Sequence, residues 1–518
     1  MGFARATTVL HFDGTTAAEL NKLIADAPDH AVIKLKPIDY AFDQSIIIAR
    51  NDITLSGSGR TKTRLRFRLH NLDDGDFIKV MGGWKERIGR VTHTAQRSAR
   101  SFMLAPGHRL KPGDVVYLSR PNTAELLEEH AWQHLPKQAA KRRPLREAIA
   151  TVAQADWLSV QLASGLPANF PKRQSTVHRL HAARNVVLSD LTLLFDNNRP
   201  EPYDFTNPFP NWISAAAIRL DRTVDARIER VNILNPPSKG IALDSSIQAT
   251  LDDIQIDGSH NKGTGGAGYG IELRETFDSK LRNLTILNTR HAVLFSSWHL
   301  EAGNEIHIRH TNRDVNFHGG LDRANVVAID SMVLDYDQSQ RKGRPKQAWS
   351  AISKGGRTHP NTNFFASNII AMKEVRGAWR NDILIAGQSG SKLNGQKGYD
   401  VIIGGPGKDI ATGGPQSDVF LLGHGNDIIT DFQPGGGGSG ESEGGDRLWL
   451  PLSFADVAGL AVQKDQGLLI RWDADASIFL EGVQFGQLRA ENIIKCMSKC
   501  DDRLLARRYQ LEPGAPQW

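Results

Sequence analysis

Residues 395–421 read GQKGYDVII, GGPGKDIAT and GGPQSDVFL, three consecutive nonapeptides with an aspartate at the sixth position of each. The aspartates continue at this spacing in both directions, and Ser391 fills the one position where a further aspartate is expected. Glycines permit tight turns, and the apolar residue after each aspartate points into a narrow core. Turns 18 residues apart are therefore expected to stack and to hold Ca²⁺ between their oxygens. The calcium-site residues predicted from this spacing are Asp382, Asp400, Asp409, Asp418, Asp427, Gly405 and Gly407.

The repeats and the sequence that follows them resemble the RTX family of calcium-binding β-rolls. After the repeats come DRLWL (446–450), GLLIRWD (467–473), SIFLEGVQF (477–485) and AENII (490–494), as in RTX C-terminal regions. The resemblance covers residues 381 to about 495, and the tail 499–518 departs from the family pattern. It implies about two or three Ca²⁺ ions, export by a type I secretion apparatus, and a secreted, extracellular protein.

The composition agrees with export. The 518 residues carry a net charge of +6, the pI is about 9.2, and the start of the chain is mixed and polar. We expect no cleaved leader and no membrane span. The basic excess favours an anionic partner, and the absence of a nucleic-acid motif favours an acidic polysaccharide over nucleic acid. Cys496 and Cys500 lack further zinc ligands, so we expect plain thiols or one local disulfide, and we expect a monomer.

A repeat of a second kind fills residues 217–318. Long strands with apolar residues at a period of two alternate with the short strands AIRLD (217–221), GIALD (240–244), GIELR (270–274), AVLFS (292–296) and DVNFH (314–318). The spacing of about 22 to 30 residues is that of one parallel β-helix rung per repeat. With a short helix capped near Thr15 and Thr16, the pattern resembles the right-handed β-helices of the pectate-lyase-like superfamily. The residues expected in left-handed turns are Asn235, Asp257, Asn288 and Asn312.

These patterns predict an all-β chain: a right-handed parallel β-helix with an inserted β subdomain, followed by an RTX parallel β-roll. The predicted ranges are 1–85 for the cap and first rungs, 86–170 for the insertion, 171–375 for the main β-helix, 376–500 for the roll and secretion region, and 501–518 for a tail. In the insertion we expect a polar helix at about 123–133. The basic run 137–146 is interpreted as a solvated loop, with substrate contact as the alternative.

Aligning the short strands separates an inward face from an outward one. The inward residues are apolar, and their neighbours must face outward. The outward columns are Arg219, Ala242, Glu272, Leu294, Asn316 and, beside them, Asp221, Asp244, Arg274, Ser296, His318. Residues 290–323 add a cluster of five histidines, and histidine can act as acid or base near neutral pH. His307 and His310 lie three apart, on opposite faces of a strand, which argues against a zinc site.

The candidate catalytic residues are His318, Arg274, His299, Asp314, Asp244 and Glu272. The candidate substrate-binding residues are Trp298, Asp221, Asn316, Asp322 and Arg323. A β-helix followed by an RTX roll resembles secreted mannuronan C5-epimerases in layout. Their catalytic motif is absent, so the resemblance supplies no catalytic residue.

The first hypothesis is a secreted calcium-dependent enzyme that acts on an acidic polysaccharide by β-elimination or C5 epimerisation. Arg274 would relieve the charge of the uronate carboxylate and His318 would be the base, oriented by Asp314 or Asp244, with His299 as the alternative acid or base. Two alternatives remain. One is a glycoside hydrolase that uses the pair Glu272 and Asp244 or the pair Asp314 and Asp322. The other is a non-catalytic matrix or adhesion protein that binds glycan.

Overall fold

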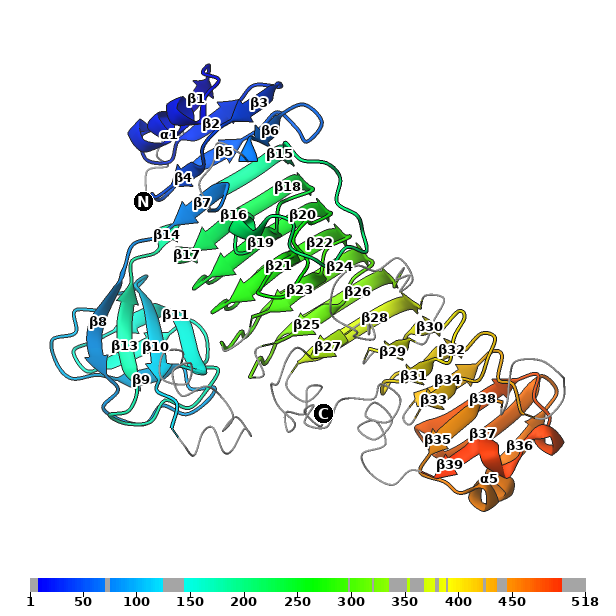
Figure 1. The fold of residues 1–518 in the computed structure, drawn as a ribbon. Helices are drawn as coiled ribbons and strands as arrows, with labels where there is room; N and C mark the ends of the chain where they lie inside the picture. Colours follow the sequence, from blue (N-terminus) through cyan, green and yellow to red (C-terminus); the bar gives the residue numbers. More distant parts are fainter. Residues whose placement is uncertain are drawn as a thin grey trace. The chain divides into compact units, whose positions relative to one another are not determined.

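The computed structural model describes residues 8–69, 75–123, 144–296, 299–318, 321–334, 352–354, 368–377, 382–387, 390–422, 425–435 and 445–495. The chain forms two compact units. The first comprises Met1–His307, Asn316–Asn325 and Lys354–Asn368, and the second comprises Ile308–Val315, Val326–Ser353 and Ile369–Trp518. Strands dominate both units, so the predicted all-β class is confirmed (Figure 1). Within the described ranges, no helix has both the length and the apolar character needed to cross a membrane.

Helix α1 (Ala17–Asp26) begins where the sequence predicts it. Thr16 is the N-cap: the Glu19 N–H donates to the Thr16 Oγ1 at 3.2 Å, and the Thr16 N–H donates to the Glu19 Oε2 at 3.0 Å. Asn21 fixes the helix on strand β4 (Ile46–Ile48), because its side chain bonds the backbone of Ser45 and of Ile47. The helix thus covers the first rungs of the unit.

Two parallel sheets run through the rungs of the first unit. One contains β1 (Val9–Phe12), β2 (Val32–Leu35), β3 (Asp39–Phe42), β5 (Thr54–Ser56), β6 (Arg64–Phe67), β15 (Val187–Phe195), β18 (Arg227–Leu234), β20 (Thr250–Asp257) and β22 (Lys280–Leu287). The other contains β4, β7 (Ile78–Met81), β16 (Ala216–Asp221), β19 (Lys239–Asp244), β21 (Tyr269–Arg274) and β23 (His291–Phe295). Three further strands are β24 (Glu305–Thr311), β25 (Val315–Phe317) and β27 (Ile352–Lys354).

The predicted alignment of the short strands is confirmed in the second of these sheets. Ile218 pairs with Ile241, Ile241 with Ile271, and Ile271 with Val293. The rings of Phe295 and Phe317 stack with their centroids 4.1 Å apart. These inward side chains form an apolar column, whose burial is the main stabilising contribution to such rungs.

The predicted turn residues are confirmed in part. Asn235 and Asn288 have φ of +56°. Asp257 does not, because it is still a strand residue that pairs with Leu234 and Leu287, and Gly258 takes the left-handed position with φ of +82°. Asn312 has no positive φ either. Of the four residues, Asp257 and Asn312 therefore do not use the left-handed conformation, and Asn312 directly follows the end of β24 at Thr311.

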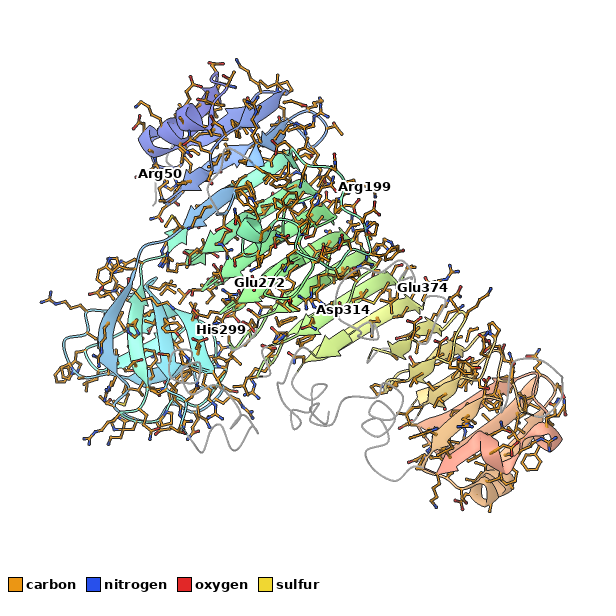
Figure 2. The ribbon with its side chains drawn as sticks, viewed as in Figure 1. Arg50, Arg199, Glu272, His299, Asp314 and Glu374 are labelled. Carbon is orange, nitrogen blue, oxygen red and sulfur yellow. The ribbon has the colours of Figure 1, made fainter. Side chains whose placement is uncertain are left out.

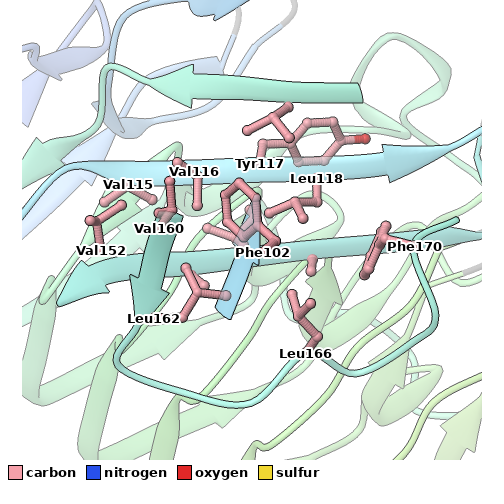
Figure 3. Close-up of a cluster of buried hydrophobic side chains, with 14 of the residues drawn as sticks. Phe102, Val115, Val116, Tyr117, Leu118, Val152, Val160, Leu162, Leu166 and Phe170 are labelled. Atoms are coloured by element: carbon pink, nitrogen blue, oxygen red, sulfur yellow. The ribbon is translucent and has the colours of Figure 1, made fainter. Parts of the chain in front are cut away.

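The inserted β subdomain is a six-stranded antiparallel sheet, and it extends past the predicted boundary at residue 170 to Leu180. Its order is β8 (Lys85–Arg90), β13 (Thr176–Leu180), β10 (Val115–Arg120), β11 (Arg146–Ala155), β12 (Ser159–Leu162) and β9 (Ser101–Met103). Its apolar core, drawn in Figure 3, continues into Val224, Ile247 and Phe277 of the rungs. The subdomain therefore packs on the ends of the short strands. The helix expected near 123–133 and most of the basic run lie outside the described residues.

The second unit carries parallel strands into the nonapeptide repeats. One sheet includes β26 (Val326–Val333), β28 (Ile369–Arg376), β30 (Lys392–Asn394), β32 (Ile410–Thr412), β34 (Gly425–Ile429), β38 (Ala476–Glu481), β37 (Gly467–Asp473) and β36 (Ala461–Lys464). The other includes β29 (Ile383–Ile385), β31 (Val401–Ile403), β33 (Val419–Leu421), β35 (Arg447–Leu450) and β39 (Ile493–Lys495), and helix α5 spans Phe454–Leu460. Val401 pairs with Val419 and Lys392 with Ile410, so the repeats stack at the predicted spacing of 18 residues. Cys496, Cys500 and the tail lie outside the described residues.

Candidate functional site

The outer face of β16, β19 and β21 carries a network of ionised side chains. Arg274 donates from its Nη2 to the Glu272 Oε1 at 2.9 Å, and its Nη1 lies 3.6 Å from the Asp244 Oδ1. The other Glu272 oxygen accepts from the Lys239 Nζ at 2.6 Å. Arg219 contacts Asp244 as well. The three predicted residues Arg274, Asp244 and Glu272 therefore do come together (Figure 2 labels Glu272).

Sequence reasoning missed Lys239 because the first residues of β19 depart from strict alternation of inward and outward side chains. A side chain on Gly240 would meet Ile256 of the facing sheet, 2.8 Å from its Cδ1. A side chain on Gly270 would meet Ile286 at 2.4 Å. These glycines face the core, so the residues before them, Lys239 and Tyr269, escape the two-residue pattern. A glycine next to an apolar inward residue is the signal that could have found them.

The outer face is less open than the sequence suggested. Glu272 is 2% exposed and Asn316 is 4% exposed, although both occupy outward positions. Arg274 has 36% of its side chain exposed. Burial by itself raises the pKa of Glu272, but Lys239 and Arg274 outweigh it and lower that pKa. Glu272 is thus an ionised anchor behind Arg274, and the accessible column is the one that contains Arg274.

His318 is partly buried, and its backbone N–H donates to the backbone carbonyl of Phe295 at 2.9 Å. Burial, with the charges of His291 and Arg290, lowers the pKa of His318 to about 4. Its imidazole is therefore neutral at neutral pH, which is the form that a general base needs. On the aligned strands it stands two rungs beyond Arg274, a step of about 4.8 Å per rung.

Other predicted site residues have other surroundings. Asp221 pairs with Arg222 at 2.6 Å, and Asp314 is 2% exposed and belongs to the second unit. Asp322 accepts from the Glu301 N–H at 3.3 Å, and Arg323 donates to the Pro167 carbonyl of the inserted subdomain at 3.0 Å. Trp298 lies outside the described residues. Arg323 therefore serves the contact between rungs and insertion, and Asp322 bonds the neighbouring rung.

His299 lies in a second cluster where the inserted subdomain meets the rungs. Its Nδ1 is 3.1 Å from the Glu147 Oε2, on β11, and 3.4 Å from the Glu275 Oε1, just after β21 (Figure 2 labels His299). Glu147 stands 152 residues before His299 and no motif marks it. Burial and the charge of Glu275 raise the pKa of Glu147 to about 7. Burial alone would raise the pKa of Glu275, but Lys85 and His299 lower it.

The aspartates of the repeats form buried stacks. Asp400, Asp409 and Asp418 are fully buried, and Asp382 and Asp427 nearly so. Each backbone N–H meets the carboxylate 18 residues on: the Asp382 N–H donates to the Asp400 Oδ1 at 2.7 Å, and the Asp400 N–H to the Asp418 Oδ1 at 2.7 Å. Asp446 extends this stack, since it accepts from the Asp418 N–H at 2.8 Å. Sequence reasoning missed Asp446 because a longer loop breaks the nine-residue spacing.

The two predicted glycines differ in their roles. The Gly405 N–H donates to the Asp409 Oδ2 at 2.7 Å, and the Ser391 N–H donates to the Asp409 Oδ1 at 2.7 Å. Gly407 presents its carbonyl to the next turn, 2.3 Å from where a side chain on Gly425 would begin. Burial raises the pKa of Asp409 to about 6 and that of Asp427 to about 7.

No protein-family model and no curated protein sequence matches this chain. Among solved structures it is similar to the Gp54 tailspike of Acinetobacter baumannii bacteriophage AP22, in complex with A. baumannii capsular saccharide, with a TM-score of 0.46 and 12% identity. That match covers 84% of this chain and 63% of the tailspike, so this chain spans less than two thirds of it. It is also similar to the tailspikes gp61 of Pseudomonas phage phi297 and gp49 of Pseudomonas phage LKA1, at 11% and 12% identity, each with a TM-score of 0.45, 84% of this chain and 70% of the other covered.

Proposed function

We propose that this protein is an extracellular, calcium-requiring enzyme that acts on an acidic polysaccharide by β-elimination or C5 epimerisation. The observation that carries the proposal is the set of contacts that the Arg274 guanidinium makes. Glu272 and Ser296 hold its guanidinium from one side, and its Nη1 stays beyond hydrogen-bond distance of Asp244. Among the described residues, that nitrogen has no hydrogen-bond acceptor. An oriented, partly exposed guanidinium with donors to spare suits a uronate carboxylate, which it can bind in a fork.

Both reactions begin with removal of the proton beside the uronate carboxylate. Arg274 stabilises the negative charge that grows on that carboxylate, and the neutral imidazole of His318 accepts the proton. Asp244 and Glu272 keep Arg274 in place. Elimination then expels the glycosidic oxygen, which takes a proton from solvent water, whereas epimerisation adds a proton from solvent water to the opposite face of the same carbon.

The carboxylate pair of a hydrolase has less support on this face. Glu272 and Asp244 both approach Arg274, so their separation does not exclude such a pair. A hydrolase also needs one carboxylic acid that keeps its proton. The lowered pKa of Glu272, caused by Lys239 and Arg274 against the effect of burial, leaves it ionised. Glu272 therefore supports the Arg274 clamp rather than acting as the acid.

The calcium requirement rests on the aspartate stacks. Ca²⁺ prefers oxygen ligands, and the repeats offer buried carboxylates with backbone carbonyls close by. N–H contacts from the preceding turns reach the Oδ1 atoms of Asp400, Asp418 and Asp446, which sets these carboxylates in register. Bound Ca²⁺ would supply the positive charge that these buried carboxylates need. Asp409 and Asp446 fit less well, because both oxygens of each already accept N–H groups.

The activity is tested with the full chain in millimolar calcium on alginate, pectate and bacterial exopolysaccharides, with a neutral glucan as control. We expect either absorbance from an unsaturated uronate or exchange of the C5 proton with solvent deuterium. New reducing ends without the unsaturated product would identify a hydrolase. Binding without turnover would identify a glycan-binding protein, and neither binding nor turnover on any acidic glycan would overturn the proposal.

The pH profile gives an independent check of His318. Its active form is the neutral imidazole, so kcat/KM is expected to be flat above about pH 5 and to fall as the pH drops through about 4. The same lowered pKa means that the unfolded state binds the proton first, so stability should rise with pH between about 4 and 6.5. A midpoint of the rate profile near 6.5 would contradict this role, because that is the value of an unperturbed histidine.

A further inference from the structure

Three potential ligand atoms converge where the inserted subdomain meets the rungs. They are the His299 Nδ1, the Glu147 Oε2 and the Glu275 Oε1, and all of them lie within 4.8 Å of one another. The nitrogen is 3.1 Å from the Glu147 oxygen and 3.4 Å from the Glu275 oxygen. Glu147 is fully buried and His299 is 7% exposed. Parts of the chain that are distant in sequence thus bring two carboxylates and one imidazole together in a largely buried position.

The remaining oxygens of both carboxylates are held by other groups. The Tyr117 hydroxyl donates to the Glu147 Oε1 at 2.6 Å, and the Lys85 Nζ lies 3.1 Å from the Glu275 Oε2, which also accepts from Ser245. These contacts fix the orientation of each carboxylate and aim its other oxygen at His299. Metal ligands are typically oriented by outer partners of this kind.

A single hydrogen on the His299 Nδ1 cannot replace a metal ion between these three ligand atoms. The Nδ1 of histidine carries at most one hydrogen, so it can donate well to only one of the two facing oxygens. Among the described residues, no other side chain donates to the Glu147 Oε2 or to the Glu275 Oε1. The Glu275 Oε1 would therefore face a nitrogen that cannot also donate to it, in a side chain that is only 13% exposed, which is unfavourable.

We propose that Glu147, Glu275 and His299 bind a divalent transition ion of the Zn²⁺ class, which ties the inserted subdomain to the rungs. A tetrahedral ion with bonds of about 2.0–2.1 Å separates neighbouring ligands by about 3.3 Å, which agrees with the two distances to Nδ1. The neutral imidazole and two carboxylates together balance the charge of such an ion. Water completes the fourth position. The site goes beyond the polysaccharide activity and does not depend on it.

The test uses the full chain, stripped of metal and returned to millimolar calcium so that the nonapeptide repeats are occupied. Cobalt(II) is titrated and its visible absorption is followed, because tetrahedral Co²⁺ absorbs strongly and Ca²⁺ does not absorb. We expect one Co²⁺ per chain, displaced by one Zn²⁺. In Tyr117→Phe, which loses an orienting contact, we expect binding to weaken about 10- to 100-fold.

Two ligand variants and one control decide the assignment. His299→Ala and Glu147→Gln should both lose the cobalt spectrum, and the isosteric Gln variant guards against a simple folding defect. His181→Ala is the control, because His181 is an exposed histidine directly after β13 and the carboxylate that it contacts is that of Glu86. It should bind like the parent protein. A folded parent that takes up no cobalt or zinc would overturn the proposal, and so would undiminished binding in both ligand variants.

Discussion

Replacing Arg274 with alanine is expected to lower kcat/KM on the acidic polysaccharide by about 100- to 1000-fold, since one preorganised donor to the developing charge is lost. Arg274→Lys should recover little of this. Lysine keeps the positive charge, but a single ammonium group cannot bond Glu272, Ser296 and a substrate carboxylate as the planar guanidinium can. Steady-state kinetics of both variants, with the parent protein beside them, measure the effect.

The control for Arg274 is Arg227→Ala. Arg227 is an exposed arginine at the start of β18, on the other sheet of the same rungs, so its loss removes the same charge away from the outer face. Thermal unfolding should confirm that all variants are folded, because Lys239 still neutralises the buried Glu272 when Arg274 is gone. Equal losses of activity in the Arg227 and Arg274 variants would show that overall charge, and not the clamp, is what matters.

The second large effect concerns calcium and the nonapeptide repeats. In excess chelator we expect the segment 382–435 to exchange its amide hydrogens rapidly, and in millimolar Ca²⁺ to be protected. The aspartates stack 18 residues apart in buried positions, so their charges repel unless an ion lies between them. Binding at 100 times Kd contributes about 2.7 kcal/mol per ion. Hydrogen exchange resolved along the full chain separates this segment from the rungs, which should stay protected in chelator.

Asp418→Asn is the informative variant for this effect, and Asp465→Asn is its control. Asp418 is fully buried in the stack, whereas Asp465 is exposed between β36 and β37. The first should raise the calcium concentration needed for protection, and the second should leave it unchanged. A repeat segment that is equally protected in chelator and in calcium would refute calcium-coupled folding. The proposed coupling would let an exporter pass the segment unfolded at low cytosolic calcium.

The arrangement of rungs was predictable because it depends on local, repeated chemistry. Apolar residues at a period of two, as in Ile218, Ile241 and Ile271, have one way to reach a shared core, and the pairing follows from it. The capping of α1 by Thr16 is local in the same sense. Turn positions were less predictable. Gly258 took the left-handed position from Asp257, since either residue tolerates that conformation and the strand length decides between them.

The site was predictable only where it lies on the repeat. Asp244 and Arg274 share one outward column and Glu272 lies in the column beside it, so alignment alone brought the three together. Glu147 reaches His299 through an insertion whose docking no repeat describes, and Lys239 faces outward because of a glycine next to it. The burial of Glu272 also depends on surroundings outside its own column. Sequence reasoning therefore did not predict contacts between the repeated strands and parts of the chain that do not repeat.

The inserted subdomain leaves and rejoins the rungs at a single step of the backbone. The Gly82 N–H donates to the Asp221 carbonyl at 2.9 Å, and the Ala183 N–H donates to the next carbonyl, that of Arg222, at 3.0 Å. Residues 82 and 183 thus bond two consecutive carbonyls of the neighbouring rung, as two consecutive residues of a strand position would. Evolution can therefore exchange or delete the whole appendage without changing the pitch of the rungs. Relatives with the same Arg274 column but a different appendage would present the same chemistry to different polymers.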